Sequence, residues 1–472
     1  MKKNTILLIL SILTYSYLAT AQNISISPDG ITPGLVGNFP RLSYDSIAAT
    51  ATPEIGDLAY VLTFLCLRVY NGTKWVCTYE NPLNPSLKIT ALATAGGENS
   101  DQGSAIAVDS SGNVYITGKF QGTANFGEIT VSAVNIFDYD SFIAKYNGSG
   151  VLQWVEIVGG GGNQTIHDMV VDISGNVLIT GSFDAVINLG NVSKVASGEN
   201  DLFIAKYNSA GTLQWADSEG GALSVLGLGI AVDSVGAAYI TGYFQGNVLF
   251  GTYSRTSVGQ SDIFVTKYNS SGDLQWVDTA GGIGSDKAND ITLDANGAIF
   301  LSGTFQDTAN FGALTIESLG LSDVFMAKYH HVGLTRDWAW VKSGGSANDD
   351  YCSGIALDDA GGIFTTGYFS DTIDFVDGAD TITKVSKGWE DIFVVKYNSS
   401  GDLEWGQSAG GPERDFASGI AVDSNGNALI GGHFEEAATF GSSSITSTGF
   451  SDIFVVKYTN SGSLHWVQGI GG

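Results

Sequence analysis

Short apolar segments alternate along most of the chain with turns rich in Gly and Asn. In the first such stretch, residues 106–109 are followed by the turn 111–113 and by the apolar run Val114–Phe120. A second pair of segments, 142–146 and the residues around Trp154, is joined by Asn-Gly-Ser-Gly. Gly and Asn readily adopt the positive φ that tight hairpin turns require. The pattern therefore predicts four short antiparallel strands in this stretch.

This four-strand unit recurs six times. Its clearest marker is a Phe-x-x-Lys-Tyr strand whose lysines are 61 residues apart, except for one interval of 68. The marker lysines are Lys145, Lys206, Lys267, Lys328, Lys396 and Lys457. A sheet with apolar residues on both faces is stable only when neighbours cover both, as in a β-propeller. We therefore expect an all-β fold, a β-propeller of four-stranded blades with six full repeats of about 61–68 residues; a linear β-solenoid is the alternative.

One strand is left over by this count. Residues 87–97 align with the fourth strand of a unit and end in the same Gly-Gly pair as Gly159-Gly160. The six full units then follow up to Gly471-Gly472. We expect an incomplete seven-bladed ring, either because the sequence is truncated or because the ring stays open. Residues 87–472 form the predicted propeller domain.

Two longer motifs resemble a known family. Asp-Ile-Phe-Val-x-Lys-Tyr-Asn-Ser-Ser-Gly-Asp-Leu-x-Trp occurs at 262–276 and 391–405, and Ile-Ala-Val-Asp-Ser-x-Gly-Asn at 106–113 and 420–427. Both resemble the SBBP family of bacterial β-propeller repeats, and the resemblance covers about 87–472. It implies a secreted or surface-exposed bacterial protein, often with several domains. It implies no particular reaction or ligand, because one fold serves many functions.

The first 21 residues have the pattern of a secretory signal peptide. Lys2 and Lys3 precede the mostly aliphatic run 5–13, and Ala19-Thr20-Ala21 predicts cleavage after Ala21. The apolar run is shorter than the ~20 residues that a membrane span needs. We therefore expect a secreted or cell-surface protein without a membrane span.

The charge balance excludes further classes of protein. The chain has 48 Asp and Glu against 21 Lys and Arg, and its formal net charge is −27. Nucleic-acid binding requires a basic surface, so no nucleic acid is expected among the partners. Because 43% of the residues are hydrophobic, a disordered chain is excluded as well.

Residues 22–86 lie between the signal peptide and the repeats, and they resemble a short N-terminal module of bacterial surface proteins. A small β-hairpin is expected here, followed by a Pro-containing linker at 81–85. If Asn71-Gly72 forms a two-residue turn, Cys66 and Cys77 oppose each other within reach of a disulfide. An exported protein meets an oxidising compartment, so we predict this disulfide and a buried, unpaired Cys352. A four-residue loop would instead place Cys66 opposite Tyr79.

Two features of the sequence weakly resemble catalytic or metal-binding motifs. Gly-x-Ser-x-Gly at 406–410 lies in a predicted fourth strand, whereas a nucleophile elbow needs a strand that turns into a helix. We interpret this match as a coincidence. The adjacent His330 and His331 lie in a lengthened turn. An exposed pair of histidines is more often part of a solvated turn than a metal site, so we interpret them as turn residues. The recurrent lysine is interpreted as a scaffold residue paired with blade carboxylates, rather than as part of a cationic ring for an anionic glycan.

Acidic residues recur just after the Gly-Gly pair, in the connection from the fourth strand to the next first strand. They are Asp101, Asp286, Asp350 and Asp415. Hard oxygen ligands in extracellular loops suit Ca²⁺, so a Ca²⁺ site is one interpretation of these residues. The other is that each carboxylate accepts backbone N–H groups within its own loop.

The connections between strands predict where a ligand binds. The one-to-two and three-to-four turns lie on one face of a four-stranded meander and are nearly invariant here. The two-to-three and four-to-one connections lie on the other face and vary, so this variable-loop face is the expected binding face. We expect a non-enzymatic binding or scaffold module that recognises an extracellular protein or glycan. The alternative is an extracellular glycoside hydrolase or lyase, which would need converging carboxylates at the propeller centre.

Overall fold

The computed structural model describes residues 92–332 and 335–471 without interruption, and seven short strands before them. The chain divides into two compact units, one of Leu13–Lys88 and one of Met1–Ile12 with Ile89–Gly472. All regular structure in the described residues is β, and no helix among them has the length and apolar character to cross a membrane. The seven early strands are β1 (Ile6–Ile9), β2 (Ser25–Ser27), β3 (Gly30–Thr32), β4 (Arg41–Leu42), β5 (Leu58–Val61), β6 (Cys66–Tyr70) and β7 (Trp75–Glu80).

The smaller unit contains the expected hairpin, with a different register. Strands β6 and β7 pair Tyr70 with Trp75 and Arg68 with Cys77, and after a bulge Cys66 pairs with Glu80. The predicted two-residue turn, and with it the direct opposition of Cys66 and Cys77, is therefore wrong. The disulfide itself stays a prediction, because the side chains of both cysteines lie outside the described residues.

The larger unit consists of six four-stranded antiparallel blades, which confirms the predicted fold class. Blade 1 shows the pattern: β10 (Val114–Phe120) pairs with β9 (Asp101–Val108) and β13 (Asp140–Tyr146), and β13 pairs with β14 (Leu152–Gly161). Gly-containing turns connect the first to the second strand and the third to the fourth, as the sequence predicts.

The other five blades repeat this order, first strand to fourth. Blade 2 is β15 (Gln164–Val171), β16 (Val177–Phe183), β19 (Asp201–Tyr207) and β20 (Leu213–Gly221). Blade 3 is β21 (Val225–Val232), β22 (Ala238–Phe244), β25 (Asp262–Tyr268) and β26 (Leu274–Gly282). Blade 4 is β27 (Lys287–Leu293), β28 (Ile299–Phe311), β29 (Leu314–Val332) and β30 (Thr335–Gly345). Blade 5 is β31 (Tyr351–Leu357), β32 (Ile363–Asp377), β33 (Asp380–Tyr397) and β34 (Leu403–Gly410). Blade 6 is β35 (Asp415–Val422), β36 (Ala428–Phe440), β37 (Ser443–Tyr458) and β38 (Leu464–Ile470).

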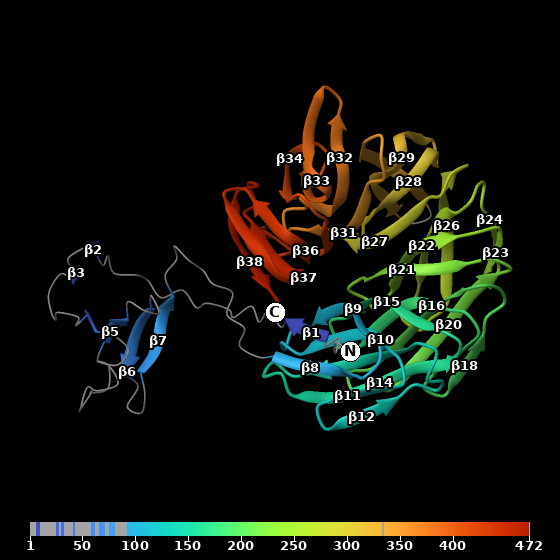
Figure 1. The fold of residues 1–472 in the computed structure, drawn as a ribbon. Coiled ribbons are helices and arrows are strands. Elements are labelled where there is room, and N and C mark those ends of the chain that lie inside the picture. The colour runs from blue at the N-terminus through green and yellow to red at the C-terminus, as the bar shows by residue number, and fades with distance from the viewer. Residues whose placement is uncertain are drawn as a thin grey trace. The chain divides into compact units, whose positions relative to one another are not determined.

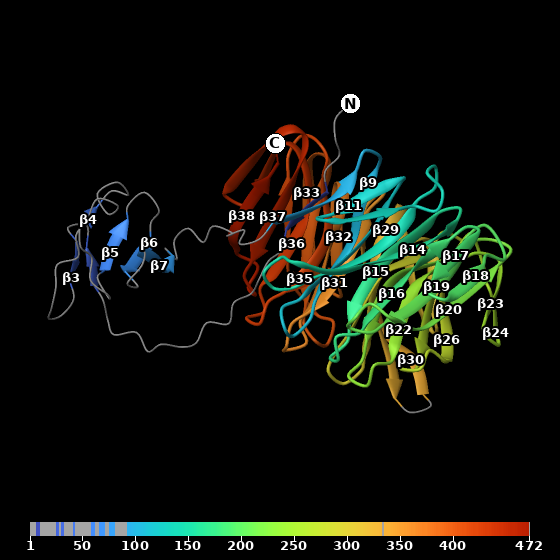
Figure 2. The same ribbon diagram turned by 90° about the horizontal axis from the view of Figure 1, so that it is seen from below.

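The two-to-three connections are β-hairpins rather than irregular loops. In blades 1 to 3 they are separate strand pairs, and in blades 4 to 6 they are the outer ends of the long second and third strands. The separate pairs are β11 (Thr123–Phe126) with β12 (Ile129–Ser132), β17 (Val186–Leu189) with β18 (Val192–Val195), and β23 (Asn247–Phe250) with β24 (Tyr253–Thr256). They lie at the outer rim of the blades (Figure 1 and Figure 2).

Each of these hairpins pairs with the fourth strand of the preceding blade. Gly160 at the end of β14 pairs with Ile187 of β17, and Gly221 at the end of β20 pairs with Val248 of β23. The Gly-Gly pairs are needed here because a Cβ at Gly160 would lie 1.9 Å from the carbonyl oxygen of Val186. The hairpins therefore join neighbouring blades through backbone hydrogen bonds.

Apolar side chains fill the space between successive blades. Between blades 1 and 2, for example, Tyr115 and Ile143 pack with Ile166 and Ile179, and all four are completely buried. Equivalent clusters lie between blades 2 and 3, 3 and 4, 4 and 5, and 5 and 6. The blades follow one another along an arc, with blade 1 and blade 6 at its ends (Figure 1).

The left-over strand is present as β8 (Leu92–Gly97). One edge of β8 pairs with β11 of the blade 1 hairpin, as a fourth strand pairs with the next blade in the rest of the molecule. Its other edge pairs with β1, from the predicted signal peptide.

Candidate functional site

The variable-loop face carries most of the exposed large apolar side chains of the described residues. Several of them lie in the six residues before the aspartate that opens the inner part of each third strand, namely Asp140, Asp201, Asp262, Asp323, Asp391 or Asp452. Those at 60% exposure or more are Val134, Ile136, Phe137, Val195, Val258, Leu319, Val385, Trp389 and Phe450, and Ile283 of a four-to-one connection also belongs to this group. An exposed apolar group of this kind on a soluble protein is typical of an interaction site.

Around the axis, the same face is lined by the starts of the first strands and the ends of the second strands. In blade 5 these positions are held by Tyr351 and Tyr368, which pair across the strands and stack with ring centroids 5.1 Å apart. Phe416 of blade 6 meets Tyr368 edge-on at 4.6 Å and lies 5.0 Å from the ring of its strand partner His433. Four rings from two blades therefore form a continuous aromatic row.

A pocket of about 310 Å³ opens beside this row, between blades 4 and 5. Its walls are polar apart from the tyrosine rings. They comprise Ser285, Lys287, Thr304, Gln306, Ser322, Asp349, Asp350, Tyr351 and Tyr368. Tyr351 is 38% exposed, so one side of its ring is free to contact a ligand. The ammonium group of Lys287 lies 4.8 Å from the ring centroid of Tyr243 in blade 3.

The four predicted acidic residues lie at equivalent places in four blades, and all are buried. Asp101, Asp286 and Asp415 each accept the backbone N–H of the second Gly in the preceding Gly-Gly pair, at 2.6–2.7 Å. Each of these three carboxylates therefore accepts a backbone N–H within its own loop, as the second interpretation expects. Of the four, Asp350 alone lines the pocket.

Burial raises the pKa of all four carboxyl groups. It reaches about 7 in Asp286 and Asp415 and about 8 in Asp350. The carboxylate that begins the preceding third strand contributes further to these shifts: Asp262 acts on Asp286, Asp323 on Asp350 and Asp391 on Asp415. At these three junctions, two buried carboxyl groups from adjacent blades are therefore neighbours.

A test with Ca²⁺ separates the two interpretations of these residues. Among the described residues, no group of three or more His, Cys, Asp or Glu side chains is arranged to hold a metal ion. We expect the melting temperature in Ca²⁺ to equal that in chelator within about 1 °C. Only an ion that binds the folded state raises its stability, so Ca²⁺ has no effect on a protein without a site for it. A larger rise in Ca²⁺ that is lost in Asp350→Asn and Asp415→Asn would show a Ca²⁺ site.

The recurrent lysine acts as a scaffold residue. In blades 2, 3, 5 and 6 it forms an ion pair with the turn aspartate of its own blade; the pairs are Lys206–Asp172, Lys267–Asp233, Lys396–Asp358 and Lys457–Asp423. In blades 1 and 4 it donates instead to a backbone carbonyl of the neighbouring blade, Ser209 or Ser399. The aspartate that begins each third strand has a different role and accepts a loop N–H, as Asp262 does from Val258.

The weak catalytic motifs keep their structural roles. Gly406–Gly410 runs through β34 as regular strand, and Ser408 pairs with Phe393, so the chain makes no nucleophile elbow. His330 is exposed and pairs with Asp337 at the end of the β29–β30 hairpin, where His331 pairs with Arg336.

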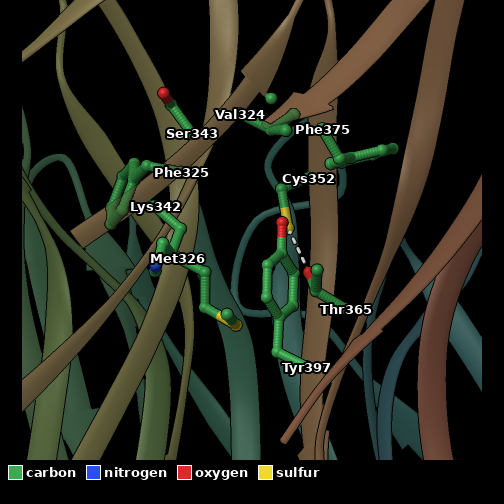
Figure 3. A pocket seen from close by; sticks show the side chains of 10 residues that line it. Val324, Phe325, Met326, Lys342, Ser343, Cys352, Thr365, Phe375 and Tyr397 are labelled. Atoms are coloured by element: carbon green, nitrogen blue, oxygen red, sulfur yellow. Dashed lines mark hydrogen bonds between the residues drawn. The ribbon is translucent and has the colours of Figure 1, made fainter. Parts of the chain in front are cut away.

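Cys352 is a free, completely buried cysteine, as predicted. Figure 3 shows its thiol between Thr365 and Tyr397, with Sγ 2.9 Å from Oγ1 of Thr365. The cavity beside it holds only about 10 Å³ and is lined largely by apolar side chains. Burial raises the pKa of this thiol, so Cys352 is a core residue rather than a nucleophile.

Two axial carboxylates escaped the sequence analysis. Asp168 and Asp290 follow a bulge in the first strands of blades 2 and 4, at positions held by Ala or Gly in the other blades. Each accepts a backbone N–H from the first strand of the next blade, Ile230 or Ile355, at 2.8 Å. Burial raises their pKa values to about 6 and about 8. They hold neighbouring blades together at the axis.

Comparison with known proteins agrees with this architecture. The family model SBBP, described as a beta-propeller repeat, matches residues 90–122 and 404–433. The chain therefore carries SBBP-type β-propeller repeats, as the sequence motifs predict.

Two curated proteins are similar at low identity. An uncharacterized WD repeat-containing protein, L264, of Acanthamoeba polyphaga mimivirus is 23% identical over 88% of this chain. The regulatory protein FlaEY of Caulobacter vibrioides is 25% identical over 46% of this chain. The matches span only 36% and 25% of the length of these relatives.

Solved structures align weakly. A DUF4221 family member from Bacteroides vulgatus aligns over 71% of this chain and 90% of its own length, with 9% identity and a TM-score of 0.34. Puromycin hydrolase, solved as an S511A mutant complexed with PGG, aligns over 84% of this chain and 56% of its own length, with 11% identity and a TM-score of 0.38.

Proposed function

We propose that the protein is a secreted or cell-surface, non-enzymatic binding module that holds an extracellular protein or glycan on its variable-loop face. The observation that carries this proposal is the combination of exposed apolar side chains and a polar–aromatic pocket on one face. Stacked tyrosines beside hydroxyl, amide and carboxylate groups suit a ligand with an apolar surface and several hydrogen-bonding groups. Repeats of the SBBP type and the WD-repeat relative support a binding role. Export is tested by the N-terminal residue of the released protein, which we expect to be Gln22.

Substitutions on the two faces test the position of the site. A glycan array and a panel of extracellular proteins identify a ligand for the wild-type protein. Tyr351→Ala with Tyr368→Ala, and separately Trp389→Ser with Phe450→Ser, are expected to weaken its binding at least about tenfold, since buried aromatic anchors dominate binding energy. Ile173→Ser with Val235→Ser, two exposed residues in one-to-two turns of the opposite face, is the control and is expected to have no effect. An equal loss in this control would contradict the proposed site.

The glycoside hydrolase or lyase alternative has one specific observation in its favour. Asp350 lines the pocket, and its pKa of about 8 is of the kind found in general acids. However, Asp286 and Asp415 show similarly raised pKa values at the same position of other blades. The shift therefore follows from the scaffold rather than from a specialised site. Turnover of any glycosidase or lyase substrate by the wild type, lost in Asp350→Asn, would favour the enzyme.

A further inference from the structure

The outer face of blade 1 is uncovered. Ile106 of β9 is 52% exposed, whereas the residue at the same position in the next four blades is 4–5% exposed. Those four residues are Met169, Ile230, Ile291 and Ile355. Val108, two residues further along β9, is 55% exposed. The preceding blade thus covers the same apolar position in blades 2 to 5, and in blade 6 the equivalent Ile420 is partly buried against blade 5.

The outer face of blade 6 is also uncovered. Val455 of β37 is half-buried, whereas its counterparts in the five other blades are 0–2% exposed. They are Ile143, Ile204, Val265, Met326 and Val394. Ile453, on the same face, is half-buried too, although its counterpart Ile392 is 3% exposed. Blade 6 therefore lacks the following blade that covers this face elsewhere.

Strand β8 shows what fits between these two faces. Its Gly96-Gly97 pair bonds to Asp101 and to the blade 1 hairpin as fourth strands do in the complete blades. On its other edge, β1 pairs Ile6 with Ala95, the residue that precedes the Gly pair. In blade 1 the corresponding pair is Ser141 of the third strand with Val158 of the fourth. The four residues of β1 thus take the register of a third strand.

We infer that the two uncovered faces and the edge of β8 form a docking site for one occupant, a three-stranded antiparallel β-unit with the repeat pattern of this chain. Such a unit supplies the first to third strands of a seventh blade, and β8 is the fourth. It covers Ile106 and Val108 on one side and Ile453 and Val455 on the other, as every internal blade covers its neighbours. Strand addition to β8 supplies backbone hydrogen bonds, and the apolar faces supply specificity. Removal of β1 with the predicted signal peptide leaves the edge of β8 free for it.

The chain itself provides the probe. Residues 412–459 contain β35, β36 and β37 and follow Gly410-Gly411, the pair that aligns with Gly471-Gly472. A mature protein extended after Gly472 by a second copy of 412–459 therefore has the natural junction. We expect its melting temperature to rise by at least about 3 °C. Hydrogen exchange of β9 and β37 is expected to slow as these strands become covered.

Two further variants keep the test decisive. Ile106→Lys is expected to be tolerated in the unextended protein but to abolish the gain of the extended one, whereas Ile230→Lys at a covered position destabilises both. An extension whose copies of Phe434 and Phe454 are changed to Asp is expected to bring no gain. The inference is overturned if the intact extension gives no rise and no slowed exchange, or if Ile106→Lys already destabilises the unextended monomer as strongly as Ile230→Lys. It is also overturned if the unextended protein sediments as a dimer with β9 and β37 protected, because the occupant is then a second copy.

Discussion

The melting temperature is expected to be at least about 5 °C lower at pH 8.5 than at pH 5. Burial raises the pKa of Asp286 and Asp415 to about 7 and that of Asp350 and Asp290 to about 8, whereas carboxyl groups of an unfolded chain titrate near 4. Between pH 4 and 8 the folded state therefore binds more protons than the unfolded state. The contribution of these carboxyl groups to the free energy of unfolding is fully present below about pH 4 and is lost as the pH rises through 7 to 8.

Three of the turn aspartates, Asp109, Asp172 and Asp423, have a lowered pKa and act in the opposite direction at lower pH. Although Asp423 is partly desolvated, hydrogen bonds from Lys457 and Asn427 lower its pKa to about 2. Its contribution is present above about pH 4 and is lost as the pH falls toward 2. We therefore expect maximal stability between about pH 4 and 6, as measured by thermal unfolding across this range.

A triple variant separates buried carboxyl groups from the overall negative charge. Asp286→Asn, Asp350→Asn and Asp415→Asn together are expected to reduce the difference in melting temperature between pH 5 and pH 8.5 by about half or more. Asp337→Asn, Asp359→Asn and Asp380→Asn change the net charge equally at exposed positions and are expected to leave the difference nearly unchanged. Equal effects of the two triple variants, or a melting temperature that does not fall with rising pH, would contradict the claim that the buried carboxyl groups cause the pH dependence of stability.

The Gly282→Ala variant is expected to lose about 3 kcal/mol of unfolding free energy, or to fail to fold. A Cβ at this position would lie 1.8 Å from the carbonyl oxygen of Thr308, in the backbone pairing between β26 and the hairpin of blade 4. The oxygen cannot move away without breaking that pairing. Unfolding in urea and by heat provides the measurement.

Gly419→Ala is the matched control. Gly419 also lies in a strand of the same fold, its φ is not positive, and a Cβ there would meet no atom within 4 Å. We expect a change of less than about 1 kcal/mol. Comparable losses in both variants would show that flexibility, rather than the contact between blades, explains the Gly pair.

The repeat pattern was sufficient to predict the blades because each depends on local signals. The period of about 61 residues, the Gly-containing turns, and the Lys and turn Asp residues, such as Lys206 and Asp172, recur in register, so several copies of each signal support one interpretation. Polar and apolar residues also alternate in segments such as Thr123–Phe126 and Ile129–Ser132. These four-residue strands were nevertheless not predicted, because they pair with another blade and nothing in the local sequence indicates that partner.

The candidate site could not be predicted, because its residues differ from blade to blade. Tyr351 and Tyr368 occupy positions that hold Gln102 and Lys119 in blade 1, so no periodic signal marks them. They become neighbours only through the pairing of the first and second strands. Asp168 and Asp290 were missed for a related reason: the bulge that precedes them interrupts the alternation from which burial is inferred.

The backward pairing of each hairpin defines the unit that can be exchanged between proteins of this kind. A single blade isolated at its visible boundaries includes a hairpin that pairs with the fourth strand of its predecessor, while its own fourth strand lacks the hairpin of its successor. A duplication or deletion of one full period of 61 residues restores every such pairing, wherever within the period the breakpoints fall. The array can therefore grow or shrink by genetic recombination at any point of the repeat, provided that the register is kept.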